Sequence, residues 1–123
     1  MIEVLRTGPL TTVQDLGRPG YRNIGVPVSG ALDPCLMTAA NAMLGNDLDA
    51  AVLEVCLGGP SLKALSGTVR ISLAGELTAQ VVNTRGRVLK VLPWQTATLF
   101  PGDVVRIGGV ARGVACVGIS GGF

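Results

Sequence analysis

The sequence predicts a mostly-β fold of many short strands with one main α-helix. The apolar residues make up 48% of the chain and are mainly Val, Leu, Ala and Ile, whereas aromatic residues make up only 3%. Branched aliphatic side chains of this kind favour strands. The 18 glycines and 7 prolines supply the turns that join many short elements. The length of 123 residues suits one domain, which we expect to be a barrel or a sandwich.

Two short strands are expected at the N-terminus, over residues 1–6 and 11–16, with Gly8-Pro9 as the turn between them. Residues 17–32 are rich in glycine and proline and form the longest predicted loop. Loops of this length in a compact domain are usually functional. This loop is therefore the first place where the sequence suggests a binding surface.

One helix is predicted after this loop, over residues 34–45. Asp33 is expected as its N-cap, because an Asp side chain accepts hydrogen bonds from the backbone of the first turn. Pro34 suits the first helical position, and Gly45-Asn46 is a typical C-terminal stop.

After residue 49 the pattern changes to an alternation of apolar and polar residues, which is typical of strands. Short runs of turn residues separate the alternating segments. We expect eight further strands, over residues 52–57, 61–65, 68–73, 77–82, 88–92, 96–100, 104–107 and 114–119.

Composition also excludes several classes of function. The chain has no histidine, which removes His-dependent triads and His metal sites, and we expect no metal. Its basic residues are scattered and its formal charge is only +2, so nucleic acid is not expected as a partner. No segment has the length of a membrane span, and no signal peptide is evident. The three cysteines, Cys35, Cys56 and Cys116, are odd in number and far apart in the sequence. Together with the lack of an evident signal peptide, they predict a cytoplasmic protein without disulfides.

Asp15 and Arg18 lie three residues apart at the end of a predicted strand. Arg18 could hold a carboxylate or a phosphate, which its planar guanidinium suits. Alternatively, Asp15 and Arg18 pair with each other and stiffen the turn, and the spacing alone favours this second interpretation.

Ser29 and Gly30 precede the predicted helix start at Asp33. Gly30 would let backbone N–H groups approach a ligand, and Ser29 could bind an anion near the positive end of the helix dipole. Ser29 and Asp33 fit equally well as plain turn and cap residues.

Asn41 and Glu54 are two further polar candidates. Asn41 lies on the flank of the predicted helix, where it could orient a neighbouring site residue. Glu54 lies within the otherwise apolar strand 52–57, where a carboxylate is costly unless it is solvated or paired. On an alternating strand, a solvent-facing Glu54 is the favoured interpretation.

Taken together in order, several segments resemble the biotin-dependent carboxyltransferase family, also called the allophanate hydrolase subunit 2 family. This family includes the C subunit of bacterial 5-oxoprolinase, the Kip antagonist and the carboxyltransferase portion of urea amidolyase. The segments are VLRTGPLTTVQDLGRPGY (4–21), GVPVSGALD (25–33), AANAMLGN (39–46), AVLEVCLGGP (51–60), LAGE (73–76), PW (93–94), PGD (101–103) and GG (121–122).

The resemblance implies a cyclophilin-like β-barrel over residues 1–123 that forms the N-terminal half of a longer family chain. It implies a companion subunit and a small amide or lactam substrate. Some family complexes cleave 5-oxoproline with ATP, and others use carboxybiotin, so either cofactor would belong to the full complex and not to this chain alone. Family members commonly carry His at Asn23, and Arg and Tyr at Val114 and Cys116.

Two functions follow from these expectations. In the first, the chain is a component of a 5-oxoprolinase or carboxyltransferase-type complex and is inactive alone. Arg18 would then hold an anion, Ser29 and Gly30 would donate to it, and Asp15 and Asn41 would orient them. In the second, the chain is a binding module without chemistry that sequesters a partner subunit, as the Kip antagonist does.

Overall fold

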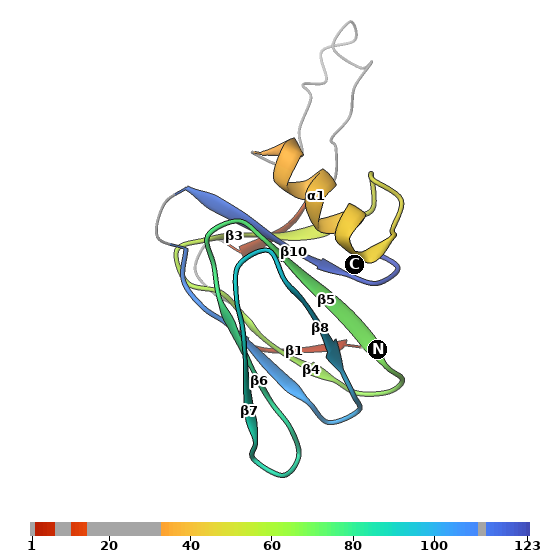
Figure 1. The fold of residues 1–123 in the computed structure, drawn as a ribbon, viewed down its shortest axis with the longest axis vertical. Coiled ribbons are helices and arrows are strands. Elements are labelled where there is room, and N and C mark those ends of the chain that lie inside the picture. Colours follow the sequence, from red (N-terminus) through yellow and green to blue (C-terminus); the bar gives the residue numbers. More distant parts are fainter. Residues whose placement is uncertain (1, 7–10, 15–32, 111–112) are drawn as a thin grey trace, which may run out of the picture.

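The computed structural model describes residues 2–6, 11–14, 33–110 and 113–123. In this part of the chain there are ten strands and one helix (Figure 1). In chain order they are β1 (Ile2–Arg6), β2 (Thr11–Gln14), α1 (Pro34–Leu44), β3 (Val52–Cys56), β4 (Ser61–Ala64), β5 (Val69–Ala74), β6 (Ala79–Val82), β7 (Val88–Val91), β8 (Thr96–Leu99), β9 (Val104–Ile107) and β10 (Val114–Ile119). Every predicted strand and the predicted helix has a counterpart, so the mostly-β class with one main helix is confirmed.

The strands form two five-stranded antiparallel sheets. Sheet A has the order β1-β4-β9-β6-β7, and sheet B has the order β2-β3-β10-β5-β8. Their facing sides enclose the main core, which includes Leu62 and Val105 from sheet A and Ile71, Leu73 and Val117 from sheet B. Burial of these aliphatic side chains between two sheets is the main source of stability in such a fold.

The two sheets are not joined into one closed ring of strands within the described residues, which differs from the predicted barrel. β7 ends sheet A and β8 ends sheet B, although they are consecutive in the chain. The reason lies in the turn between them. Trp94 donates its backbone N–H to the Leu73 carbonyl, and the Gln95 carbonyl accepts from the Leu73 N–H, so the chain joins β5 instead of pairing with β7.

Sheet B is covered on both faces. One face contacts sheet A, and α1 lies across the other (Figure 1). Beneath the helix, a second apolar cluster contains Met37 and Ala40 of α1 with Val52, Ala74 and Cys116 of the sheet. The β6–β7 hairpin lies at the end of the molecule opposite α1 (Figure 1).

No helix in the described ranges is long and apolar enough to cross a membrane.

Candidate functional site

The start of α1 is held by its own cap. The Asp33 side chain accepts hydrogen bonds from the backbone N–H of Cys35 at 3.0 Å and of Leu36 at 3.2 Å, and Pro34 opens the helix. Gly45 ends it in the left-handed conformation, with φ of 70°. The cap interpretation of Asp33 is therefore confirmed. Since Asp33 occupies these two N–H groups, they are not available to an added anion.

Close contact fixes α1 on sheet B. Gly118 of β10 lies so near the helix that an added Cβ would come within 2.6 Å of Ser72 Oγ and 3.0 Å of the Ala40 carbonyl oxygen. Ser72 Oγ in turn donates to that same carbonyl at 2.8 Å. A glycine is needed at position 118 because no side chain fits between helix and sheet.

Asn41 anchors the segment that follows α1. Its side chain is fully buried, and its Nδ2 donates to the carbonyls of Leu48 at 3.2 Å and Ala50 at 2.8 Å. Its Oδ1 accepts from Asn46 Nδ2, which also donates to the Ile119 carbonyl. This network ties the end of the helix to the end of β10, and it satisfies polar groups that would be costly to bury alone.

Glu54 and Cys116 form a buried polar pair on the helix-covered face. They lie directly opposite each other in the β3–β10 ladder, on the same face as Val52, which contacts α1. Glu54 is only 6% exposed. The prediction that Glu54 faces solvent is therefore wrong, because α1 covers the face of sheet B that lies away from the main core.

The Cys116 thiol is kept in its neutral form. Burial, and then the nearby negative charges of Glu54 and Asp33, raise the pKa of Cys116 to about 12. At neutral pH a thiol with a raised pKa carries very little thiolate, which is the form that acts as a nucleophile or a metal ligand. Within the described parts of the chain, no three His, Cys, Asp or Glu side chains are placed to hold a metal ion.

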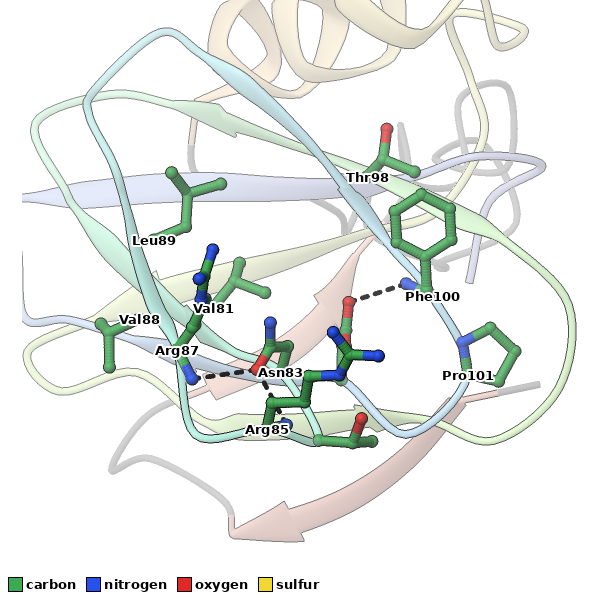
Figure 2. A pocket seen from close by; sticks show the side chains of 11 residues that line it. Val81, Asn83, Arg85, Arg87, Val88, Leu89, Thr98, Phe100 and Pro101 are labelled. Carbon is green, nitrogen blue, oxygen red and sulfur yellow. Dashed lines mark hydrogen bonds between the residues drawn. The ribbon is translucent and has the colours of Figure 1, made fainter.

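A groove of about 720 Å³ lies at the other end of the molecule, beside the β6–β7 hairpin of sheet A and the end of β8 of sheet B. Val81 contributes to its floor, and Leu89 of β7 lies opposite Val81 in the ladder. Figure 2 shows the side chains of Val88 and Leu89 on one side and those of Thr98, Phe100 and Pro101 on the other, with Asn83 and Arg85 between them.

The mouth of this groove is built by the β6–β7 turn. Asn83 Oδ1 accepts from the backbone N–H of Arg85 and of Arg87, each at 2.9 Å. Gly86, with φ of 79°, supplies the left-handed residue that this turn requires. Asp103 also lines the groove, and its Oδ2 accepts from the Phe100 N–H at 2.9 Å. A rigid turn therefore carries two guanidinium groups beside an apolar floor.

Comparison with known proteins identifies the family. Residues 24–123 match the model of the carboxyltransferase domain, subdomain A and B. The chain belongs to this carboxyltransferase family. The resemblance found in the sequence motifs is thus confirmed.

Relatives and solved structures agree with this assignment. The chain is 47% identical to the C subunit of 5-oxoprolinase from Escherichia coli over 58 residues, which cover 47% of this chain and 19% of that protein. It is 39% identical to urea amidolyase of Lachancea kluyveri over 84 residues, which cover 68% of this chain and 4% of that protein. The structure of Kluyveromyces lactis urea carboxylase superposes with a TM-score of 0.86 at 34% identity, covering 98% of this chain and 10% of that one. This carboxyltransferase-family chain therefore spans a small part of the proteins it matches.

The site residues predicted from the sequence fall into two groups. Asp15, Arg18, Ser29 and Gly30 lie outside the described residues, so their roles stay predictions. Asn41 is described, and its hydrogen bonds go to the backbone after α1 and to Asn46.

Sequence reasoning missed the groove and its two arginines. One signal was present, because residues 77–102 contain Arg85, Arg87 and Lys90 and no acidic residue. A local excess of positive charge of this kind attracts anionic groups. Because these basic residues do not form a continuous run, the sequence alone does not group them on one surface.

Proposed function

We propose that this chain is one component of a biotin-dependent carboxyltransferase-type complex that acts on a small amide or lactam. The observation that carries the proposal is the match of residues 24–123 to the carboxyltransferase domain family. The relatives named as the C subunit of 5-oxoprolinase and as urea amidolyase support an amide or lactam as the substrate class.

We further propose that the chain needs a companion subunit and is inactive alone. The matched relatives are much longer than the matched segments, and the chain has no histidine for acid–base work. Its buried thiol stays protonated at neutral pH, because its pKa is raised. These features support a role in which the chain contributes part of a site that it shares with another chain. We expect the complex to be cytoplasmic.

ATP or carboxybiotin would then be held mainly by the other parts of the complex. The N-terminus of a helix is a common phosphate site, but at α1 Asp33 already accepts from the N–H groups of Cys35 and Leu36. The described residues at this helix start therefore do not fit a phosphate. Carboxybiotin would supply the carboxyl group, and the predicted loop residues Arg18, Ser29 and Gly30 remain the candidates on this chain for contacting it or the substrate.

Reconstitution tests the proposal. The chain is expressed with the protein encoded by the neighbouring reading frame, and the purified mixture is assayed for 5-oxoproline-dependent and urea-dependent ATP hydrolysis. We expect turnover of one substrate in the mixture and none with either chain alone. Turnover by this chain alone would refute the need for a companion, and binding between the chains with no turnover of either substrate would refute the amide or lactam assignment.

Arg18→Ala sharpens the assignment of the loop. A charge-assisted contact from Arg to a carboxylate or phosphate is worth about 1.5–3 kcal/mol, so affinity for the turned-over substrate should fall about tenfold to a hundredfold. If Arg18 only pairs with Asp15, the variant should instead melt at a lower temperature and keep its affinity.

A second function is favoured by one observation. Of the twelve large apolar side chains that are exposed in the described residues, five lie between residues 88 and 100. Three of these five, Val88, Leu89 and Phe100, line the same groove, and exposed apolar side chains gathered on one surface are typical of a protein-binding site. A binding module that sequesters a partner subunit would form a stable complex with it and lower the partner's own activity, whereas an enzyme component would raise it.

A further inference from the structure

Strand β7 has one free edge in the described part of the chain. It is the last strand of sheet A and pairs only with β6. Asn83 donates its N–H to the Arg87 carbonyl at 2.9 Å, and the Arg87 N–H donates to Asn83 Oδ1, so Asn83 and Arg87 occupy a hydrogen-bonded position of the ladder. In an antiparallel ladder such pairs alternate with pairs whose backbone groups point outward. The N–H and C=O groups of Val88 and Lys90 therefore point away from β6, at the edge of the sheet.

Apolar side chains are exposed beside this edge. Val88 is 59% exposed and Leu89 is 61% exposed, and Phe100 across the groove is 58% exposed. Leu89 lies opposite the buried Val81 in the ladder, so both project to the same face. The groove thus joins the edge of the core, at Val81, to the exposed side chains of Leu89 and Phe100. An apolar side chain placed there would be shielded from water by Leu89 on one side and by Phe100 on the other.

Basic residues outnumber acidic ones around this edge. Residues 77–102 contain three basic residues, Arg85, Arg87 and Lys90, and no acidic residue. Asp103 lines the groove, but it is buried and accepts from the Phe100 N–H. A second copy of this chain would bring the same positive charges to the edge and be repelled. An acidic segment would be attracted.

A plainer explanation of this charge exists. A Lys on an edge strand protects against aggregation by discouraging other strands from pairing there. Lys90 alone would fit that role. However, a protected edge is also short of exposed apolar side chains, whereas β7 exposes Val88 and Leu89 next to an open groove. Binding of a particular partner would account for both the apolar and the charged residues.

We propose that β7 binds an extended segment of a partner protein that alternates acidic and apolar residues. The segment pairs with the outward N–H and C=O groups of Val88 and Lys90 and adds a strand to sheet A. Its apolar side chains enter the groove against Val81, Leu89 and Phe100. Its carboxylates lie on the opposite face, beside Lys90, and an acidic residue next to the turn meets Arg85 and Arg87. The proposal shares with the proposed function only the premise that a second chain binds, and it is tested by binding and not by turnover.

The first experiment uses two short synthetic peptides with blocked ends. One alternates glutamate with valine, and the other alternates lysine with valine. Binding is followed by fluorescence anisotropy of labelled peptide and by amide hydrogen exchange of the whole chain. We expect the acidic peptide to bind at least about tenfold more tightly than the basic one at low salt. We also expect it to slow exchange at the amides of Val88 and Lys90.

Three variants separate strand addition from simple charge attraction. Lys90→Pro removes one outward N–H and leaves the ladder to β6 intact, since proline is tolerated where an edge N–H faces solvent. Lys90→Gln is its matched control, because it removes the same charge and keeps the N–H. The double variant Arg85→Ala with Arg87→Ala removes the charge at the groove mouth. Arg6→Ala, on the edge strand β1 of the same sheet, controls for the loss of an exposed arginine elsewhere.

The outcomes are distinct. The proposal predicts that Lys90→Pro weakens binding by about tenfold more than Lys90→Gln, that the double arginine variant weakens it by about tenfold, and that Arg6→Ala leaves it unchanged. Equal binding by Lys90→Pro and Lys90→Gln would overturn strand addition. Equal binding of the acidic and basic peptides would overturn the charge argument. A short single-stranded DNA that binds as tightly as the acidic peptide, with the same response to the variants, would overturn the choice of a protein segment.

Discussion

The two ends of this molecule treat their polar and apolar groups in opposite ways. On the α1-covered face of sheet B, Ser72 and Asn41 make buried hydrogen bonds to backbone carbonyls, and the Cys116 thiol, with its raised pKa, is sealed in its neutral form. At the groove beside β7, Val88 and Leu89 are exposed and the adjacent turn is basic. The α1-covered face of sheet B, here called the closed face, stabilises the fold. The edge of β7, here called the open edge, leaves an exposed surface to which a partner could bind. A result that contradicts this contrast would change which end of the molecule is assigned to stability and which to binding.

The largest effect is expected from Gly118→Val. The new side chain would collide with Ser72 Oγ, the Ala40 carbonyl oxygen and Leu44 Cδ1, so α1 must move off the sheet. We expect a loss of about 3 kcal/mol or more in the free energy of unfolding, measured by urea denaturation.

Gly121→Ala is the control for Gly118→Val. Gly121 has no atom within 4 Å of an added Cβ, although its φ of 85° disfavours a side chain, so a loss of about 1 kcal/mol is expected. Equal losses at the two glycines would show that α1 is not held by close contact at Gly118.

Asn41→Ala tests whether Asn41 serves the fold. The variant removes the donor to the Leu48 and Ala50 carbonyls and leaves both without this partner. We expect a loss of about 2 kcal/mol in the free energy of unfolding, with unchanged binding at the β7 edge. An unchanged stability together with a loss of substrate affinity in the reconstituted complex would instead support the role of Asn41 as an orienting site residue.

Cys116 makes the closed face sensitive to alkaline pH. Burial raises the pKa of Cys116 from its ordinary value of 9.0 to about 12, so folding favours the neutral thiol. Its stabilising contribution is complete below about pH 9 and is lost as the pH rises toward 12, because the unfolded thiol ionises first.

Comparison with Cys116→Ala isolates this contribution. Between neutral pH and about pH 11, the free energy of unfolding should fall by about 3 kcal/mol more in the unsubstituted chain than in Cys116→Ala. Parallel pH profiles of the two proteins would mean that the thiol ionises as freely in the fold as in the unfolded chain.

The smallest effect on stability is expected at the open edge. Leu89→Ser removes an apolar side chain that is 61% exposed, so the free energy of unfolding should change by less than about 0.5 kcal/mol. The same variant should weaken binding of the acidic peptide, because Leu89 lines the groove. A large loss of stability would show that Leu89 belongs to the core, and the groove would then not be a free surface.

Local patterns in the sequence were enough to predict the elements of this protein. Asp33, Pro34 and Gly45 mark both ends of α1 through short-range backbone chemistry. The alternation after residue 49 predicted all eight later strands, because the side chains of a strand point in alternate directions. The ordered family motifs also predicted the carboxyltransferase family correctly.

Tertiary structure decided which surfaces are covered and which are open. Alternation shows that Glu54 and Ser72 face away from the main core, but only the packing of α1 on sheet B reveals that this second face is also buried. Similarly, the absence of acidic residues from 77 to 102 is visible in the sequence, whereas the position of β7 at an edge depends on how Trp94 and Gln95 join β5. Short-range chemistry sets where each element begins and ends, and contacts between residues distant in sequence set which faces and edges remain free.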